Sequence, residues 1–325
     1  MLSNLRLVCL MPTYNKETTL AKAIESVIMQ KTDFDYKLII LDDCSVDNSN
    51  KIANEYKEKY PEKIQIIKNE KNLGLLKTIT NAYYSLKNVD YFCVLDADDW
   101  YIYDKKFSDA VDFLDKHKDF SIYMSNITLL QNEEEKQYFV TDKNTIDYCW
   151  NDYKKGKMPH IQTSGVVYRN IYFKDGMNEQ FLNGTKEPYG EQMRADGFRT
   201  VWHLKSGKAH FVNRFESVYN YNDNGIWASL TSFEQSLLNA KLSFAFSEIL
   251  TDEQSYFLNQ MKRLYDTAIE GFRRNDESYI NKNKDLIFYM YSKTYLSENP
   301  IFDNKSVRVK KRVLKSLFNK ILRKK

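Results

Sequence analysis

Apolar and polar residues alternate along the first part of this chain in blocks of strand and helix length. Predominantly apolar runs at 5–11, 37–41, 64–67 and 91–95 have the length of buried strands. Between them, apolar residues recur every three or four positions, which is the spacing of an amphipathic helix. After the first run this helical face consists of Leu20, Ala23, Ile24, Val27 and Ile28. The alternation predicts an α/β fold with a mostly parallel sheet flanked by helices.

Beyond residue 120 the alternation loosens into shorter strands and longer helices. A helix is predicted near 191–205, and the pattern from 228 to 296 is helical with almost no turn signals. The shorter strands are predicted at 120–124, 164–168, 209–213 and 217–221. We therefore expect a domain at 1–225, a helical extension at 226–300 and a tail at 301–325.

The composition is that of an ordinary globular protein. The 325 residues are 42% hydrophobic and 28% charged, and the 10 Gly and 5 Pro argue against long flexible linkers. The four cysteines are widely spaced and form no CxxC pair, which favours a reducing compartment over a disulfide framework or a zinc site. The first residues have no signal-peptide layout, and no apolar run is long enough to span a membrane. We expect a cytoplasmic protein.

Positive charge is concentrated in the tail. Ten of the 48 Lys and Arg residues lie in 305–325, which has no acidic residue, so the other 38 face 44 acidic residues and the body carries −6. This balance opposes nucleic-acid binding. In the tail, apolar residues recur at helical spacing and basic residues lie between them, which is the pattern of an interfacial helix on anionic lipid. The alternative is a helix docked on the body of the protein or on another subunit. The apolar stripe is Val313, Leu314, Leu317, Phe318, Ile321 and Leu322.

The fourth apolar run ends in three carboxylates, Asp96, Asp98 and Asp99. Acidic groups at the end of a buried strand repel one another and resist burial. A divalent cation would compensate them, because hard cations take oxygen ligands. The alternative is a solvated acidic turn.

Polar residues also follow the first two strands. Because ligands of open α/β sheets bind outside the carboxyl ends of the strands, these residues and the acidic cluster are expected to share one rim. The convergence indicates an enzyme or a nucleotide binder. Neither a GxGxxG loop nor a GxxxxGK[ST] loop is present, which disfavours dinucleotide dehydrogenases and P-loop enzymes. The rim residues are Thr13, Tyr14, Asn15, Asp42, Asp43, Asp96 and Asp98.

Four motifs together resemble a known family. They are Met11-Pro12-Thr13-Tyr14-Asn15, Leu41-Asp42-Asp43-Cys44-Ser45-Val46-Asp47, the segment 69–74, and Asp96-Ala97-Asp98-Asp99. Their order and spacing resemble those of the family 2 inverting glycosyltransferases of bacterial cell-surface polysaccharide synthesis. The resemblance covers residues 5–225. It implies a GT-A nucleotide-diphospho-sugar transferase fold.

The resemblance also implies roles for individual residues in binding a nucleotide-sugar donor, with UDP-sugars favoured. Thr13 and Asp43 would hold the uracil and ribose, and Asp96 would lie near the ribose hydroxyls. For Asp43 the alternative is a cap on the following turn. For Lys77 the alternative to nucleotide binding is a solvated helix lysine. The remaining predicted donor-binding residues are Tyr14, Asn15 and Gly74.

The chemistry follows from the same resemblance. Asp98 would bind Mn²⁺ or Mg²⁺, which acts as a Lewis acid for the leaving diphosphate, and Asp99 would orient the loop or contact the acceptor. Inverting transfer needs a general base for the acceptor hydroxyl. Asp196 is the predicted base and Glu191 the alternative; for Asp196 a purely structural helix-start carboxylate is the competing interpretation.

The predicted function is therefore metal-dependent, inverting sugar transfer to a saccharide or lipid-linked saccharide acceptor in capsule, lipopolysaccharide or related glycan assembly. A lipid-linked acceptor would give the basic tail a purpose, with the protein peripheral on the inner face of the cell membrane. A nucleotidyltransferase acting on a sugar phosphate is the alternative, although it would normally show a Gly-rich loop after the first strand. A phospho-acceptor signalling domain, of about 120 residues, would leave most of the chain unexplained.

Overall fold

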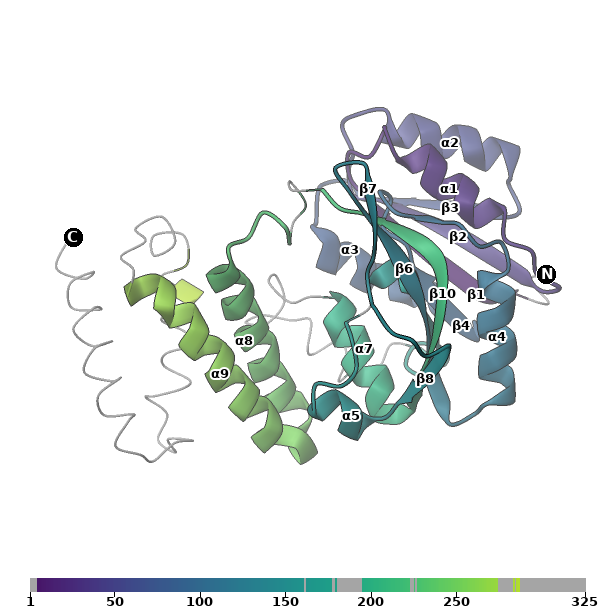
Figure 1. Ribbon diagram of the computed structural model, residues 1–325. Helices are drawn as coiled ribbons and strands as arrows, with labels where there is room; N and C mark the ends of the chain where they lie inside the picture. The colour runs from purple at the N-terminus through teal and green to yellow at the C-terminus, as the bar shows by residue number, and fades with distance from the viewer. Residues whose placement is uncertain are drawn as a thin grey trace, which may run out of the picture. The chain divides into compact units, whose positions relative to one another are not determined.

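The structure is a computed structural model that describes residues 5–160, 162–176, 179, 195–222, 225, 227–273, 283, 285 and 286. It divides into two compact units, residues 1–225 and 226–325, and each is described by itself. The first unit is built on one mixed sheet (Figure 1).

The first four long strands form the parallel part of this sheet. The strands β1 (Leu5–Thr13), β2 (Asp35–Asp42), β3 (Ile64–Lys68) and β4 (Tyr91–Val94) pair in parallel in the order β3-β2-β1-β4. The helices α1 (Leu20–Ile28), α2 (Ser49–Lys59) and α3 (Leu75–Ala82) connect them. The predicted strand–helix alternation is thus present.

The second half of the sheet mixes strand directions. Its order continues from β4 through β9 (Val166–Arg169), β6 (Phe120–Gln131) and β10 (Lys208–Asn220) to β5 (Trp100–Tyr101). The strand β9 is antiparallel to both of its neighbours, whereas β6 and β10 are parallel to each other. Two short strands lie beside this path: β7 (Glu134–Gln137) pairs with β6, and β8 (Thr145–Tyr148) pairs with β10.

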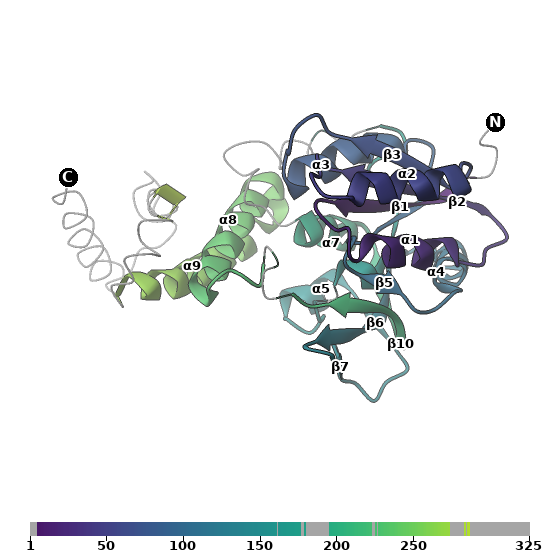
Figure 2. The same cartoon turned by 90° about the horizontal axis from the view of Figure 1, so that it is seen from above.

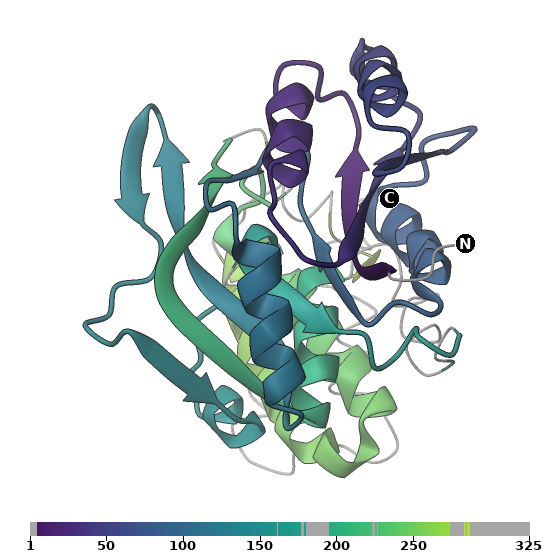
Figure 3. The ribbon, with the colours of Figure 1, turned by 90° about the vertical axis from the view of Figure 1, so that its right-hand side faces the viewer.

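Helices cover both faces of the sheet. The helices α1, α2 and α4 (Lys106–Lys116) lie on one face, whereas α3 and α7 (Ala195–Ser206) lie on the other (Figures 1 and 2). Figure 3 looks onto the α1 and α4 face. Because successive side chains of a strand point to opposite faces, each strand contributes to a core on each side of the sheet. Cys93 faces the aliphatic core under α1 and α4. Its neighbour Phe92 faces the other core, an aromatic cluster in which it stacks on Tyr168 and contacts Tyr83, Phe173 and His203.

Two strand predictions are wrong in detail. The separate strands expected at 209–213 and 217–221 are one strand, β10, which stays paired with β6 through register shifts between Val212 and Ser217. Such irregularities bend a strand without ending it. The strand expected at 164–168 begins only at Val166, because Thr163–Gly165 form a 3-10 turn.

The described part of the second unit consists of two long helices. The helix α8 (Ser232–Ile249) begins with a capping box formed by Thr231 and Glu234, and α9 is Gln254–Arg273. The predicted continuous helical pattern is interrupted by a short 3-10 turn, Thr251–Glu253. Phe246 and Phe257 stack across the turn with ring centroids 4.9 Å apart. Among the residues described, no helix is long and apolar enough to cross a membrane.

Candidate active site

The turns that follow β1 and β2 are tied to each other. Thr13 and Asp42 are register partners at the carboxyl ends of these strands. Asn15 has a φ of 51°, a left-handed conformation that Asn tolerates better than most residues. Its backbone N–H donates to the Ser45 hydroxyl at 3.1 Å, and its side-chain oxygen accepts from the Val46 N–H at 2.9 Å. The first two motifs of the sequence therefore form one rigid edge.

Thr13 and Tyr14 at this edge differ in side-chain exposure. The Thr13 hydroxyl is buried and donates to the backbone carbonyl of Met11 at 3.1 Å. The Tyr14 ring is 45% exposed, as expected of a group available to stack on a ligand. Thr13 is therefore part of the buried layer beneath the rim.

Asp43 organises the loop 69–74. Its Oδ1 accepts from the side-chain amide of Asn69 and from the backbone N–H of Leu73, both at 2.8 Å, and its Oδ2 accepts from the Gly74 N–H at 2.9 Å. Gly74 has a φ of +81°, which explains a glycine immediately before α3. Asp43, which we expected at the nucleotide base or as a turn cap, holds the third motif to the second. Lys77, one turn into α3, is exposed.

The acidic loop follows β4 directly. Burial, and after it the negative charge of Asp98, raises the pKa of Asp96 to about 7. Burial, and after it the negative charges of Asp96 and Asp98, hold the pKa of Asp99 well above its usual range. Asp99 nevertheless accepts hydrogen bonds from the Asn220 N–H, at 3.0 Å, and from the Ser164 hydroxyl. Asp99 therefore anchors the acidic loop to the end of β10, which agrees with its expected orienting role.

Lys16 forms an ion pair with Asp98 across the rim. The Lys16 side chain is 33% exposed and the Asp98 side chain 25%. Sequence reasoning missed this contact, although Lys16 directly follows the Asn15 that ends the first motif. The Lys16 ammonium, a point charge on a flexible stem, is thus the counter-charge of Asp98 in this structure.

The acidic loop fits a divalent cation of the expected kind. Mg²⁺-type sites commonly use one or two carboxylates and complete their shell with substrate phosphates and waters. Asp98 supplies a partly exposed carboxylate, and the raised pKa of Asp96 reports negative charge that a metal ion would relieve. Within the described part of the chain, no group of three or more His, Cys, Asp or Glu side chains is placed to hold a metal ion by itself.

Asp196 lies beside this loop, although the two are a hundred residues apart in sequence. It is in the first turn of α7, and its negative charge contributes to raising the pKa of Asp96. His160 contacts it, with 3.4 Å between His160 Nε2 and Asp196 Oδ2. The structure thus places Asp196 within electrostatic range of Asp96. The alternative base, Glu191, lies outside the described residues, as does the tail 305–325.

Arg199 is a second charge that the sequence did not reveal. It lies one turn after Asp196, is 2% exposed, and donates to the Tyr83 hydroxyl at 3.1 Å. Its positive charge lowers the pKa of Asp96 and so opposes the effect of Asp98 and Asp196. His203, on the same helix, is fully buried, and burial lowers its pKa to about 3, so this histidine is neutral.

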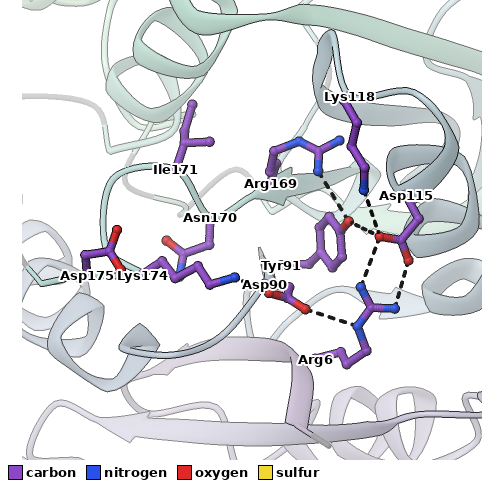
Figure 4. Close-up of a pocket in the computed structure, with 10 residues that line it drawn as sticks. All are labelled: Arg6, Asp90, Tyr91, Asp115, Lys118, Arg169, Asn170, Ile171, Lys174 and Asp175. Carbon is purple, nitrogen blue, oxygen red and sulfur yellow. Dashed lines mark hydrogen bonds and ion pairs between the residues drawn. The ribbon is translucent and has the colours of Figure 1, made fainter.

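A charged cavity lies at the opposite end of the strands (Figure 4). It is lined by Arg6 near the start of β1 and by Asp90 just before β4. Arg6 is bonded to Asp90 at 3.1 Å and to Asp115 at 2.8 Å, and Lys174 is bonded to Asp90 at 2.5 Å. Cations and carboxylates neutralise one another here, so the network joins the amino ends of the strands to the end of α4.

Comparison with known proteins decides the family. The family described as glycosyl transferase family 2 matches residues 8–184, which is more than half of the chain. The chain belongs to glycosyl transferase family 2. The dTDP-rhamnosyl transferase RfbG of Shigella flexneri is 34% identical to this family 2 chain over 126 residues, 36% of the chain and 40% of RfbG. An uncharacterized protein of Mycobacterium tuberculosis (strain H37Rv) is 24% identical over 221 residues, 67% of this chain and 59% of the relative. The match thus spans less than two thirds of these relatives.

Solved structures of the same fold include glycosyltransferases with bound donors. Staphylococcus aureus TarS 1–349, in complex with UDP-GlcNAc, has a TM-score of 0.55 and 16% identity, covering 95% of this chain and 92% of TarS. A mannosyltransferase from Pyrobaculum calidifontis, in complex with GDP-Man and Mn²⁺, has a TM-score of 0.52 and 12% identity over 96% of this chain and 85% of that protein. The predicted GT-A fold and family are confirmed.

Proposed function

We propose that this protein is a metal-dependent inverting glycosyltransferase that moves a sugar from a nucleotide-sugar to a saccharide acceptor. The observation that carries the proposal is that the negative charges of Asp98 and Asp196 both raise the pKa of Asp96, which lies at the carboxyl end of β4. Asp196 belongs to a helix and Asp98 to the strand exit, so separate carboxylates are available for base catalysis and for metal binding.

In this proposal each residue has one task. Tyr14 and the loop held by Asp43 receive the nucleotide, and Asp98 would hold Mn²⁺ or Mg²⁺ after Lys16 has turned away. The metal supplies Lewis-acid stabilisation of the leaving diphosphate. Asp196 accepts the proton of the acceptor hydroxyl as that oxygen bonds to the anomeric carbon, while the bond from this carbon to the diphosphate oxygen breaks.

The donor's nucleotide is a finer part of the proposal. The relatives and neighbours are named for dTDP-rhamnose, UDP-GlcNAc and GDP-mannose, so three nucleotides are represented among them. We propose a UDP-sugar, because the first two motifs resemble the uracil-binding positions of the family. Incubation with Mn²⁺ and a panel of UDP-, GDP- and dTDP-sugars should release UDP together with sugar transfer. Release of another nucleotide would overturn the UDP assignment, and transfer of a nucleotidyl group would overturn the reaction class.

The acceptor is proposed to be a saccharide of a cell-surface polysaccharide. If the basic tail binds the membrane, a lipid-linked saccharide is the favoured acceptor. One relative, GgaB of Bacillus subtilis, is named a minor teichoic acid biosynthesis protein; it is 38% identical over 112 residues, 34% of this chain and 12% of GgaB. Deletion of 305–325 should reduce binding to vesicles that contain anionic lipid at low salt, because the ten basic charges are lost. Unchanged binding would refute the membrane role.

A further inference from the structure

His160 lies beside Asp196, the proposed base. Its Nε2 lies 3.4 Å from Asp196 Oδ2. Contacts of catalytic carboxylates are often long before substrate binds and tighten in the complex. The imidazole is 46% exposed and the Asp196 side chain 19%, so the histidine lies on the solvent side of the carboxylate.

Ser164, four residues after His160 in the sequence, contacts the acidic loop. It is fully buried, and its hydroxyl hydrogen-bonds to Asp99. The Ser217 hydroxyl of β10 in turn donates to Ser164 at 3.3 Å. His160 and Ser164 therefore contact two different acidic parts of the rim, Asp196 and Asp99.

Two described neighbours of Asp196 can change charge near neutral pH: His160, and Asp96, whose pKa burial and Asp98 raise to about 7. Arg199 and the buried hydroxyls of Tyr83 and Tyr168 also interact with Asp196 electrostatically. Arg199 stays charged, and burial raises the pKa of both tyrosines, so these three keep their protonation state. A histidine changes its charge in the range in which enzymes work.

We propose that His160 is the positioning residue of the base Asp196. With the proton on Nε2, the imidazole donates to Asp196 Oδ2 and turns the other carboxylate oxygen toward the acceptor hydroxyl. In serine proteases a carboxylate orients a catalytic histidine; here a histidine would orient a catalytic carboxylate. Protonation of His160 adds a positive charge next to the base and makes it a weaker proton acceptor.

The inference rests on the proposed function, and kinetic variants separate its two parts. His160→Gln keeps an N–H donor without the titration, whereas His160→Ala removes both. We expect H160A to lower kcat by about tenfold to a hundredfold at unchanged donor KM, and H160Q to retain most of kcat while the acid limb of its pH profile moves to lower pH. His117→Gln is the matched control, because His117 is an exposed histidine at the end of α4, and it should behave as the wild type. Wild-type values of kcat and pH profile in H160A would overturn the role of His160.

A second measurement does not depend on activity. The chain has four histidines, so the imidazole signal of His160 is identified in an NMR titration by its loss in H160Q. In Asp196→Asn the titration midpoint of this signal should move to lower pH, because the imidazolium loses its anionic partner. An unchanged midpoint would overturn the contact even in an active enzyme. A shifted midpoint in a protein that transfers no sugar would support the contact and refute the proposed function alone.

Discussion

Substitution of Lys106 by Met tests the charge network that supports the acidic loop from inside the protein. Lys106 Nζ lies 3.0 Å from Glu216 Oε2 and 2.9 Å from the Ser125 hydroxyl, and both charged side chains are 0% exposed. The Glu216 carbonyl accepts the Ile102 N–H at 2.9 Å, which holds β10 to the chain just after the acidic loop. The ion pair therefore joins α4 to the strand whose end holds Asp99.

The structure sets the size of the effect. Removing one partner of a buried ion pair costs about 3–5 kcal/mol, because the other charge is left buried and uncompensated. Glu216 keeps two partners, Arg214 at 2.6 Å and the Tyr123 hydroxyl at 3.0 Å. We therefore expect the lower end of the range, about 3 kcal/mol. For a unit of this size that loss lowers Tm by roughly 6–12 °C.

Chemical denaturation and thermal melting followed by circular dichroism measure this loss. Lys116→Met is the matched control, because Lys116 lies on the same helix in an exposed pair with Asp112, whose loss costs about 0–1 kcal/mol. Adding Glu216→Gln to K106M should recover part of the stability, because the neutral amide no longer needs a counter-charge. If K106M is as stable as K116M, the buried pair does not hold β10 in place.

Two further predictions concern the rim. Asp43→Ala removes the acceptor of three hydrogen bonds from the loop 69–74 and should raise the donor KM at least tenfold, whereas Ala at the exposed Glu70 of the same loop should not; equal KM values in steady-state assays would contradict the role of Asp43. Burial and Asp98 raise the pKa of Asp96 to about 7, so its carboxylate gains a proton as the pH falls below that value. Mn²⁺ affinity, measured by titration calorimetry, should therefore weaken from pH 8 to pH 6, and a pH-independent affinity would show that Asp96 does not assist the metal.

The sequence predicted the parts of the fold that follow from local pattern. Apolar runs and the helices between them predict β1 to β4, and the carboxyl ends of these strands place Thr13 and Asp43 on one rim with Asp96. The continuity of β10 could not be predicted, because its bend depends on pairing with β6 across register shifts. The turn at Thr251–Glu253 had a partial signal: Thr251 and Gln254 have the spacing of a capping box, which marks a helix start in this region, although α9 itself begins at Gln254.

Site residues that belong to a sequence motif could be proposed from the sequence, whereas contacts between residues far apart in the chain could not. Asp196 was expected as the base from the family resemblance and stays a prediction, although its charge is close enough to raise the pKa of Asp96. The pairing of Lys16 with Asp98 spans 82 residues. His160 stands in a polar stretch with no periodic pattern, so nothing in the sequence linked it to α7. Such contacts arise from the tertiary fold and have no local sequence signature.

The central claim is that Asp98 serves the metal and Asp196 the acceptor, and one comparison tests it directly. Donor binding in the presence of Mn²⁺ and single-turnover sugar transfer are measured for the wild type, Asp98→Asn and Asp196→Asn. D98N should lose metal-dependent donor binding, whereas D196N should bind the donor as the wild type does and transfer sugar at least about a hundredfold more slowly. Transfer by D196N at the wild-type rate would contradict this claim.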